Sequence, residues 1–182
     1  MMGTYDVDYE ITQFKDLDYM QIAVTVDKKA IRDKEAIHIA FPFAIDSAQV
    51  KIGVDNTYIT PEKGQIPGSN KDFYSVQRWL DVSGKGDYGV TISSPESALF
   101  EVGSMVDERE VNAGTKLWKK ENHSSPTVFA YVMNNYWHTN SKADQSGKVT
   151  FNFYLHFHKA FDLQEAQRMG AEISEPLLIY AQ

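Results

Sequence analysis

The chain has 182 residues, a formal net charge of −7 and no cysteine. This length suffices for one domain with its own core, and the lack of cysteine excludes disulfides, thiolate metal ligands and cysteine nucleophiles. An acidic chain without a basic cluster has nothing to neutralise a phosphate backbone, so we expect no nucleic-acid partner. No apolar run approaches the roughly 20 residues that span a bilayer, so we expect no membrane-spanning helix. The first residues lack the basic and apolar regions of a signal peptide, so we expect no signal peptide.

Alternation of apolar and polar residues, which is typical of half-buried strands, recurs along most of the chain. The first two such segments, Tyr5 to Ile11 and Met20 to Val26, flank a Lys-Asp-Leu-Asp turn, and Ile37 to Phe43 forms a third. The clearest strand is Val149 to Phe157, in which every odd-numbered residue is apolar. Further strands are predicted at Gln49–Val54, Val76–Val82, Tyr88–Ser93, Ala98–Val102 and Thr127–Met133.

One helix is predicted near Leu163–Ile173. Asp162 can cap it, Glu165 completes a capping box, and Pro176 ends it before a last short strand at Leu177–Tyr180. Many short strands and one helix predict an all-β fold, a two-sheet antiparallel sandwich with one short C-terminal helix, in a single domain spanning residues 1–182. The residues expected to face the core are Ile22, Val24, Ile39, Phe41, Val90, Ile92, Phe151, Phe153 and Leu155.

Residues 133–140, with the sequence MNNYWHTN, combine three asparagines with a threonine, a tyrosine, a tryptophan and a histidine. Flat aromatic faces beside amide donors and acceptors are what a protein needs to bind a sugar. The alternative is a buried polar network in which every amide has a partner, because an unpaired one costs about 1–3 kcal/mol. The candidates for a carbohydrate-facing or domain-facing surface in this segment are Asn134, Asn135, Trp137, His138 and Asn140.

A second candidate surface follows the loop from Pro61 to Tyr74. It adds Asp72, Tyr74, Gln77 and Trp79, and we expect Trp79, Asn135 and His138 to meet at one end of the sandwich, with the loop folded over them. In the alternative interpretation, Trp79 packs in a second apolar layer and Arg78 pairs with a surface carboxylate.

Catalytic and metal-binding patterns are weak in this chain. His156 and His158 form an H-x-H pair, but no third ligand is placed by the sequence, and two solvent-facing histidines are the simpler interpretation. No spacing brings two carboxylates together as an acid and a base; the candidates are Asp72, Asp81, Asp87 and Glu101. We therefore expect no metal or other cofactor in this chain, and no catalysis by the chain alone.

Three segments of the chain are similar to one known family. MNNYWHTN, the earlier EAIHIAFPF (35–43) and IPGSNKDFYSVQRWLDVS (66–83) resemble the C-terminal β-rich region of bacterial α-mannosidase-like enzymes of glycoside hydrolase family 38. The resemblance runs from about Tyr19 to the C-terminus and keeps the order of the segments. It implies a sandwich domain behind a zinc-dependent catalytic domain of the same polypeptide, which this chain does not contain.

The resemblance implies a non-catalytic domain that acts in carbohydrate metabolism by scaffolding and rimming the active site of that catalytic domain, with a mannose-type glycan as a possible ligand. This hypothesis predicts a large, partly apolar surface that an ordinary monomer does not expose. A free-standing carbohydrate-binding module is the alternative, and predicts an exposed Trp or Tyr platform. A mutarotase-like sugar-active sandwich is a third hypothesis. The sequence leaves the compartment open between bacterial cytoplasm and periplasm.

Overall fold

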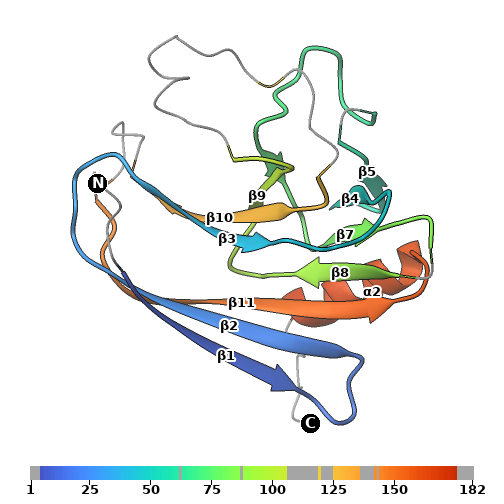
Figure 1. Cartoon of the computed structure of the whole chain (residues 1–182), viewed down its shortest axis with the longest axis horizontal. Helices are drawn as coiled ribbons and strands as arrows, with labels where there is room; N and C mark the ends of the chain where they lie inside the picture. The colour runs from blue at the N-terminus through green and yellow to red at the C-terminus, as the bar shows by residue number, and fades with distance from the viewer. Residues whose placement is uncertain are drawn as a thin grey trace, which may run out of the picture.

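The computed structural model describes residues 5–61, 63–86, 88–105, 119, 125–135, 142 and 144–175. In this part of the chain two antiparallel sheets face each other, and one helix lies against the larger sheet (Figure 1). The predicted antiparallel sandwich with one short C-terminal helix is confirmed. No helix among the described residues is long and apolar enough to cross a membrane.

The larger sheet has seven strands in the order β1-β2-β11-β8-β7-β4-β5. The long strand β11 pairs with β2 on one side and β8 on the other, and β1 forms one edge. In sheet order the strands are β1 (Asp6–Gln13), β2 (Tyr19–Lys28), β11 (Gly147–His158), β8 (Gly89–Ser93), β7 (Leu80–Ser83), β4 (Gln49–Val54) and β5 (Thr57–Ile59).

The smaller sheet has four strands in the order β3-β10-β9-β6. One of its two inner strands, β10, carries an irregularity between Tyr131 and Met133, where the register with β3 shifts. The strands are β3 (Ala36–Phe41), β10 (Val128–Asn134), β9 (Leu99–Val102) and β6 (Tyr74–Ser75).

The core between the sheets follows the predicted alternation. Phe151 and Phe153 are 5% and 0% exposed, whereas Asn152 between them is only partly buried, so the predicted register of this strand is confirmed. The rings of Phe153 and Phe41 meet edge to face with centroids 5.0 Å apart and join the two sheets. Of the nine residues expected to face the core, all but two are buried, and Ile22 and Ile39 pack partly buried against the same cluster.

The strand predicted at Val76–Val82 begins only at Leu80. The preceding residues cross from the small sheet to the large one: the backbone N of Val76 donates to Ala98 O, whereas that of Gln77 donates to Gly53 O. The apolar alternation of this segment thus serves a crossing between two layers. Alternation alone does not distinguish such a crossing from a continuous strand.

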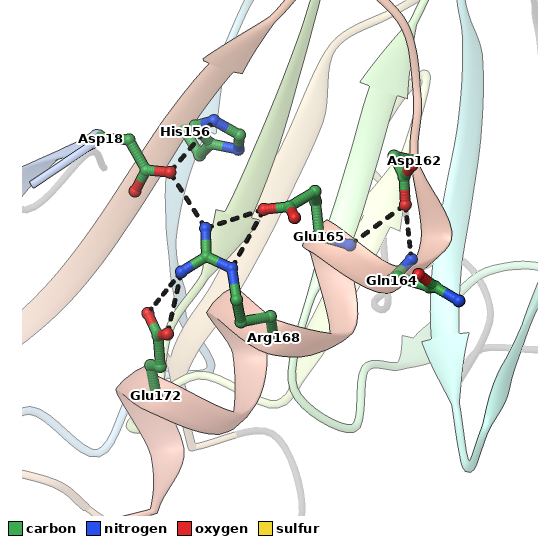
Figure 2. A network of polar contacts seen from close by, with 7 residues as sticks. All are labelled: Asp18, His156, Asp162, Gln164, Glu165, Arg168 and Glu172. Carbon is green, nitrogen blue, oxygen red and sulfur yellow. Dashed lines mark hydrogen bonds and ion pairs between the residues drawn. The ribbon is translucent and has the colours of Figure 1, made fainter.

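The helix α2 spans Leu163–Ser174 and begins as predicted at Asp162. The Asp162 carboxylate accepts hydrogen bonds from the backbone N of Gln164 at 2.8 Å and of Glu165 at 3.2 Å (Figure 2). The helix buries Ala166, Met169 and Gly170 against the rest of the domain. The strand predicted at Leu177–Tyr180 lies outside the described residues.

Arg168 connects α2 to the turn between β1 and β2. Its guanidinium group contacts Glu165 and Glu172 on the helix and Asp18 in the turn between β1 and β2, at 3.0 Å (Figure 2). The Asp18 carboxylate in turn lies 3.7 Å from Nε2 of His156 on β11. The three ion pairs of Arg168 are half-exposed, and each stabilises little by itself, but together they hold the helix over the sheet.

Candidate functional site

Asn135 has a fully paired side chain. Its Oδ1 accepts from the backbone N of Glu35 at 2.7 Å, and its Nδ2 donates to the carbonyl oxygens of Ile31 and Asp33, both at 2.8 Å. Only 3% of Asn135 is exposed. At this residue the structure has the buried polar network that the sequence left as an alternative, and this network fixes the loop that follows β2.

Asn134 faces more open surroundings. Its backbone N donates to Oε1 of Gln145 at 3.1 Å, and the residue borders a cavity of about 530 Å³ together with Met133 and Lys142. The other candidates of this segment, Trp137, His138 and Asn140, lie outside the described residues. We predicted that His138, Trp79 and Asn135 lie together. The structure therefore tests this prediction only for Trp79 and Asn135.

Asp72 and Tyr74 are both buried, at 1% and 2% exposure. The Asp72 carboxylate accepts from the backbone N of Lys119 at 2.8 Å, which ties the 61–74 loop to a segment far along the chain. The Tyr74 ring belongs to the core, and its hydroxyl donates to Oε1 of Gln65 at 3.4 Å. Both side chains hold the loop in place, and neither is exposed enough to form a ligand-facing surface.

Trp79 packs in a second apolar layer between the large sheet and α2. It is 2% exposed, and its ring lies against Phe161, Gly53 and Gly170. The neighbouring Arg78 forms an ion pair with Glu175. This arrangement is the alternative given above for this segment, so Trp79 is a packing residue and not an exposed platform.

The structure also separates Trp79 from Asn135, which contradicts the prediction that they share one end of the sandwich. Leu80, next to Trp79, lies in a row across the large sheet that also contains Met20 of β2. Asn135 contacts the loop that follows Lys28, at the other end of β2. Met20 and Lys28 are eight residues apart, which is roughly 26 Å along a strand.

A buried polar cluster on the outer face of the large sheet was not predicted. Asp81, with 0% exposure, accepts from Ser83 Oγ at 2.6 Å and Thr91 Oγ1 at 2.9 Å, and Nε2 of His158 lies 2.6 Å from its Oδ2. The ammonium group of Lys51 lies 3.6 Å from Asp81 and donates to Ser83 Oγ at 2.7 Å. A carboxylate with this many partners is well compensated for its burial.

A second carboxylate–histidine pair lies on the smaller sheet. Nε2 of His38 is 2.8 Å from Glu101 Oε1, and Glu101 is 1% exposed. The imidazole stacks on Tyr131 with centroids 4.5 Å apart, and Tyr131 stacks on Phe73. The histidine and carboxylate are thus held rigidly by a stack of three rings.

These pairs do not form an acid–base couple with each other. The neighbours of Asp81 and Glu101 along their strands face the core, so both carboxylates point outward, on opposite sides of the sandwich. Two packed sheets are about 10 Å apart, so the carboxylates are too far apart for the roughly 5–9.5 Å that glycoside hydrolysis requires. Asp87, another candidate of the sequence, lies outside the described residues.

The histidines of the H-x-H pair are mostly buried, which contradicts their interpretation as solvent-facing. The exposed fractions of their side chains are 15% for His156 and 12% for His158, and each faces its own aspartate. Among the described residues, no group of three or more His, Asp or Glu side chains is arranged to hold a metal ion.

The edge strand β1 exposes an apolar row on the core side of the large sheet. In the register, Tyr9 lies opposite Val24 and Ile11 opposite Ile22, both of which face the core. Yet Val7, Tyr9 and Ile11 are 40%, 69% and 65% exposed. We call these three residues the β1 ledge. Figure 1 shows β1 as the strand of the large sheet farthest from the small sheet, which explains why the small sheet does not cover it.

The ledge continues toward the turn between β1 and β2. There Leu17 and Phe157, 48% and 45% exposed, line a groove of about 290 Å³ with Met20 and Leu155. Several large apolar side chains are therefore exposed on one side of a single sheet, whereas scattered single ones would be ordinary.

Comparison with known proteins finds no family model and no curated protein that matches the chain.

Proposed function

We propose that this chain is the non-catalytic C-terminal β-sandwich domain of an α-mannosidase-like glycoside hydrolase, which docks through the β1 ledge onto a zinc-dependent catalytic domain. The proposal rests on the resemblance of three sequence segments to family 38. The zinc belongs to the catalytic domain, and this chain acts by holding and rimming its active site.

The observation that favours this proposal is the exposure of the β1 ledge. Tyr9 and Ile11 occupy core-facing positions of a strand, where a self-sufficient sandwich would cover them. Burying apolar surface stabilises an interface by about 25 cal/mol per Å² before the cost of association, so a partner that covers the row has a clear driving force. A free-standing sugar platform has less support, since Trp79 is buried.

Charge favours a different partner over a second copy of the chain. On the opposite face of β1 lies an acidic row, Asp6, Asp8 and Glu10, and all three side chains are exposed. Antiparallel pairing of two β1 edges would bring two such rows together, and like charges directly opposite each other are destabilising. A catalytic domain that presents an apolar strip meets no such repulsion.

Isolation of the protein from its native cells tests the proposal. An affinity tag at the C-terminus of the chain captures a catalytic domain whether it is joined covalently or bound non-covalently. We expect the captured material to hydrolyse an aryl α-mannoside, and a chelator to abolish this activity until zinc is restored. Captured protein without any α-mannosidase activity would contradict the proposal.

A further inference from the structure

A pocket of about 320 Å³ lies between α2 and the turn that joins β4 to β5. Its volume is at the lower end of the range for small-molecule sites, about 300–1,000 Å³. Trp79 and Gly53 contribute to its lining on the side of the sheet. The lining also includes one carboxylate, that of Asp55, and four side-chain amides, those of Asn56, Gln77, Gln164 and Gln167.

These amides have hydrogen-bonding capacity to spare. Within the described part of the chain, the side-chain amides of Asn56, Gln164 and Gln167 have no hydrogen-bond partner. The carbonyl oxygen of Gln77 accepts from the backbone N of Asp55, which leaves its NH₂ group for a ligand. Each amide offers both donors and an acceptor, and four of them around one small pocket match a ligand that carries several hydroxyl groups.

The charges at the pocket do not select an anionic ligand. Arg168 lines the pocket, but its guanidinium group is directed to Glu165, Glu172 and Asp18 (Figure 2). Arg78 is paired with Glu175. Since both cations are compensated by carboxylates and Asp55 adds a further carboxylate to the lining, an anion gains little from entering, and we take the four amides as the groups that recognise a ligand.

We propose that this pocket binds a neutral, polyhydroxylated ligand of the size of one hexose. The amides of Gln77, Gln164 and Gln167 would bond its hydroxyl groups. The buried indole of Trp79 closes the pocket on the side of the sheet and offers no face for stacking. The site is independent of docking through the β1 ledge, because α2 lies on the outer face of the large sheet whereas the ledge belongs to the core side. It holds even if the chain has no catalytic partner.

Nuclear magnetic resonance of the ¹⁵N-labelled chain tests this proposal with D-mannose, D-glucose and D-galactose as probes. We expect at least one hexose to shift the indole N–H of Trp79 and the side-chain amides of the pocket saturably, with a dissociation constant in the millimolar range. Cyclohexanol, a ring of similar size with one hydroxyl group, should cause no saturable shift.

Two variants complete the test. Gln167→Leu should weaken hexose binding about fivefold, the effect of one lost hydrogen bond. Gln49→Leu replaces an exposed glutamine at the start of β4 and should leave binding unchanged. The proposal is overturned if no hexose produces a saturable shift at the pocket, or if a folded Gln167→Leu variant binds as tightly as the wild type. Neither result would bear on the docking of β1.

Discussion

Trp79 and Gly170 lie in direct contact between the large sheet and α2. A Cβ atom added to Gly170 would stand 2.9 Å from Cδ1 of Trp79 and 3.0 Å from Cβ of Arg78. The helix can therefore approach the indole only where it has no side chain. This contact sets the distance between α2 and the sheet, and with it the width of the amide-lined pocket.

Gly170→Ala should destabilise the domain although alanine favours a helix by up to about 1 kcal/mol over glycine. The added methyl group overpacks the contact with Trp79 and should cost about 1–3 kcal/mol. Urea unfolding followed by circular dichroism measures the change, with Gln164→Ala at an exposed position of the same helix as a control. A Gly170→Ala variant at least as stable as the wild type would show that the contact is loose.

Trp79→Ala should lower the free energy of unfolding by about 3–5 kcal/mol, the usual cost of removing a large buried aromatic side chain. Trp79→Phe keeps much of the packing and should cost less. The burial of Trp79, which is 2% exposed, accounts for both costs. Loss of less than about 1 kcal/mol on Trp79→Ala would contradict the assignment of Trp79 as a packing residue.

Asp81→Asn should destabilise the domain by about 3 kcal/mol, because it leaves the partly buried Lys51 and His158 without their common carboxylate. Asp27→Asn makes the same chemical change at an exposed position of β2 and should stay within about 0.5 kcal/mol of the wild type. Chemical denaturation of both variants compares them directly. If the Asp81→Asn and Asp27→Asn variants had the same free energy of unfolding, the Asp81 cluster would contribute nothing to the stability of the domain.

Tyr5 makes stability depend on pH in the alkaline range. Burial, the hydrogen bond to Glu35 and the negative charge of Glu35 raise the pKa of Tyr5 from 10.0 to about 12. The unfolded chain loses the phenolic proton first, so the free energy of unfolding falls as pH rises from about 10 to about 12, and Tyr5 adds no pH dependence below that range.

Tyr5→Phe should remove this part of the alkaline fall. Melting temperatures of the wild type and the variant, measured from about pH 8 to about pH 12, should therefore converge as pH rises. Tyr88→Phe, at a tyrosine that is 56% exposed, serves as the control and should follow the wild type throughout. Parallel curves for wild type and Tyr5→Phe would show that the phenol of Tyr5 is not held by Glu35.

Local periodicity sufficed to predict most of the fold. The apolar residues of β11, such as Phe151 and Phe153, and the helix cap at Asp162 depend on neighbours within a few residues, and all appear as expected. The prediction of a strand at residues 76–79 was wrong, because the same alternation suits a segment that hydrogen-bonds first to one sheet and then to the other.

The candidate site depended on contacts between distant residues, and there the prediction was weaker. Asp81 and His158 are 77 positions apart and meet only through the register of β7, β8 and β11. A carboxylate between two apolar residues, as in Leu80-Asp81-Val82, was the available signal, but it does not identify the histidine. The exposure of the β1 ledge likewise depends on how far the small sheet extends, which no local pattern encodes.

The central claim is that the β1 ledge is an interface with a catalytic domain. The most direct measurement compares aryl α-mannosidase activity per mole of captured protein for the wild type and the double variant Tyr9→Ser, Ile11→Ser. Tyr88→Ser removes another exposed tyrosine elsewhere, 56% exposed against 69% for Tyr9, and is the matched control. We expect the double variant to lose activity at least tenfold, which corresponds to roughly 1.4 kcal/mol or more. The isolated chain with the same two substitutions should keep its free energy of unfolding within about 1 kcal/mol of the wild type. The Tyr88→Ser variant should keep its activity. Undiminished activity in the double variant would contradict the claim.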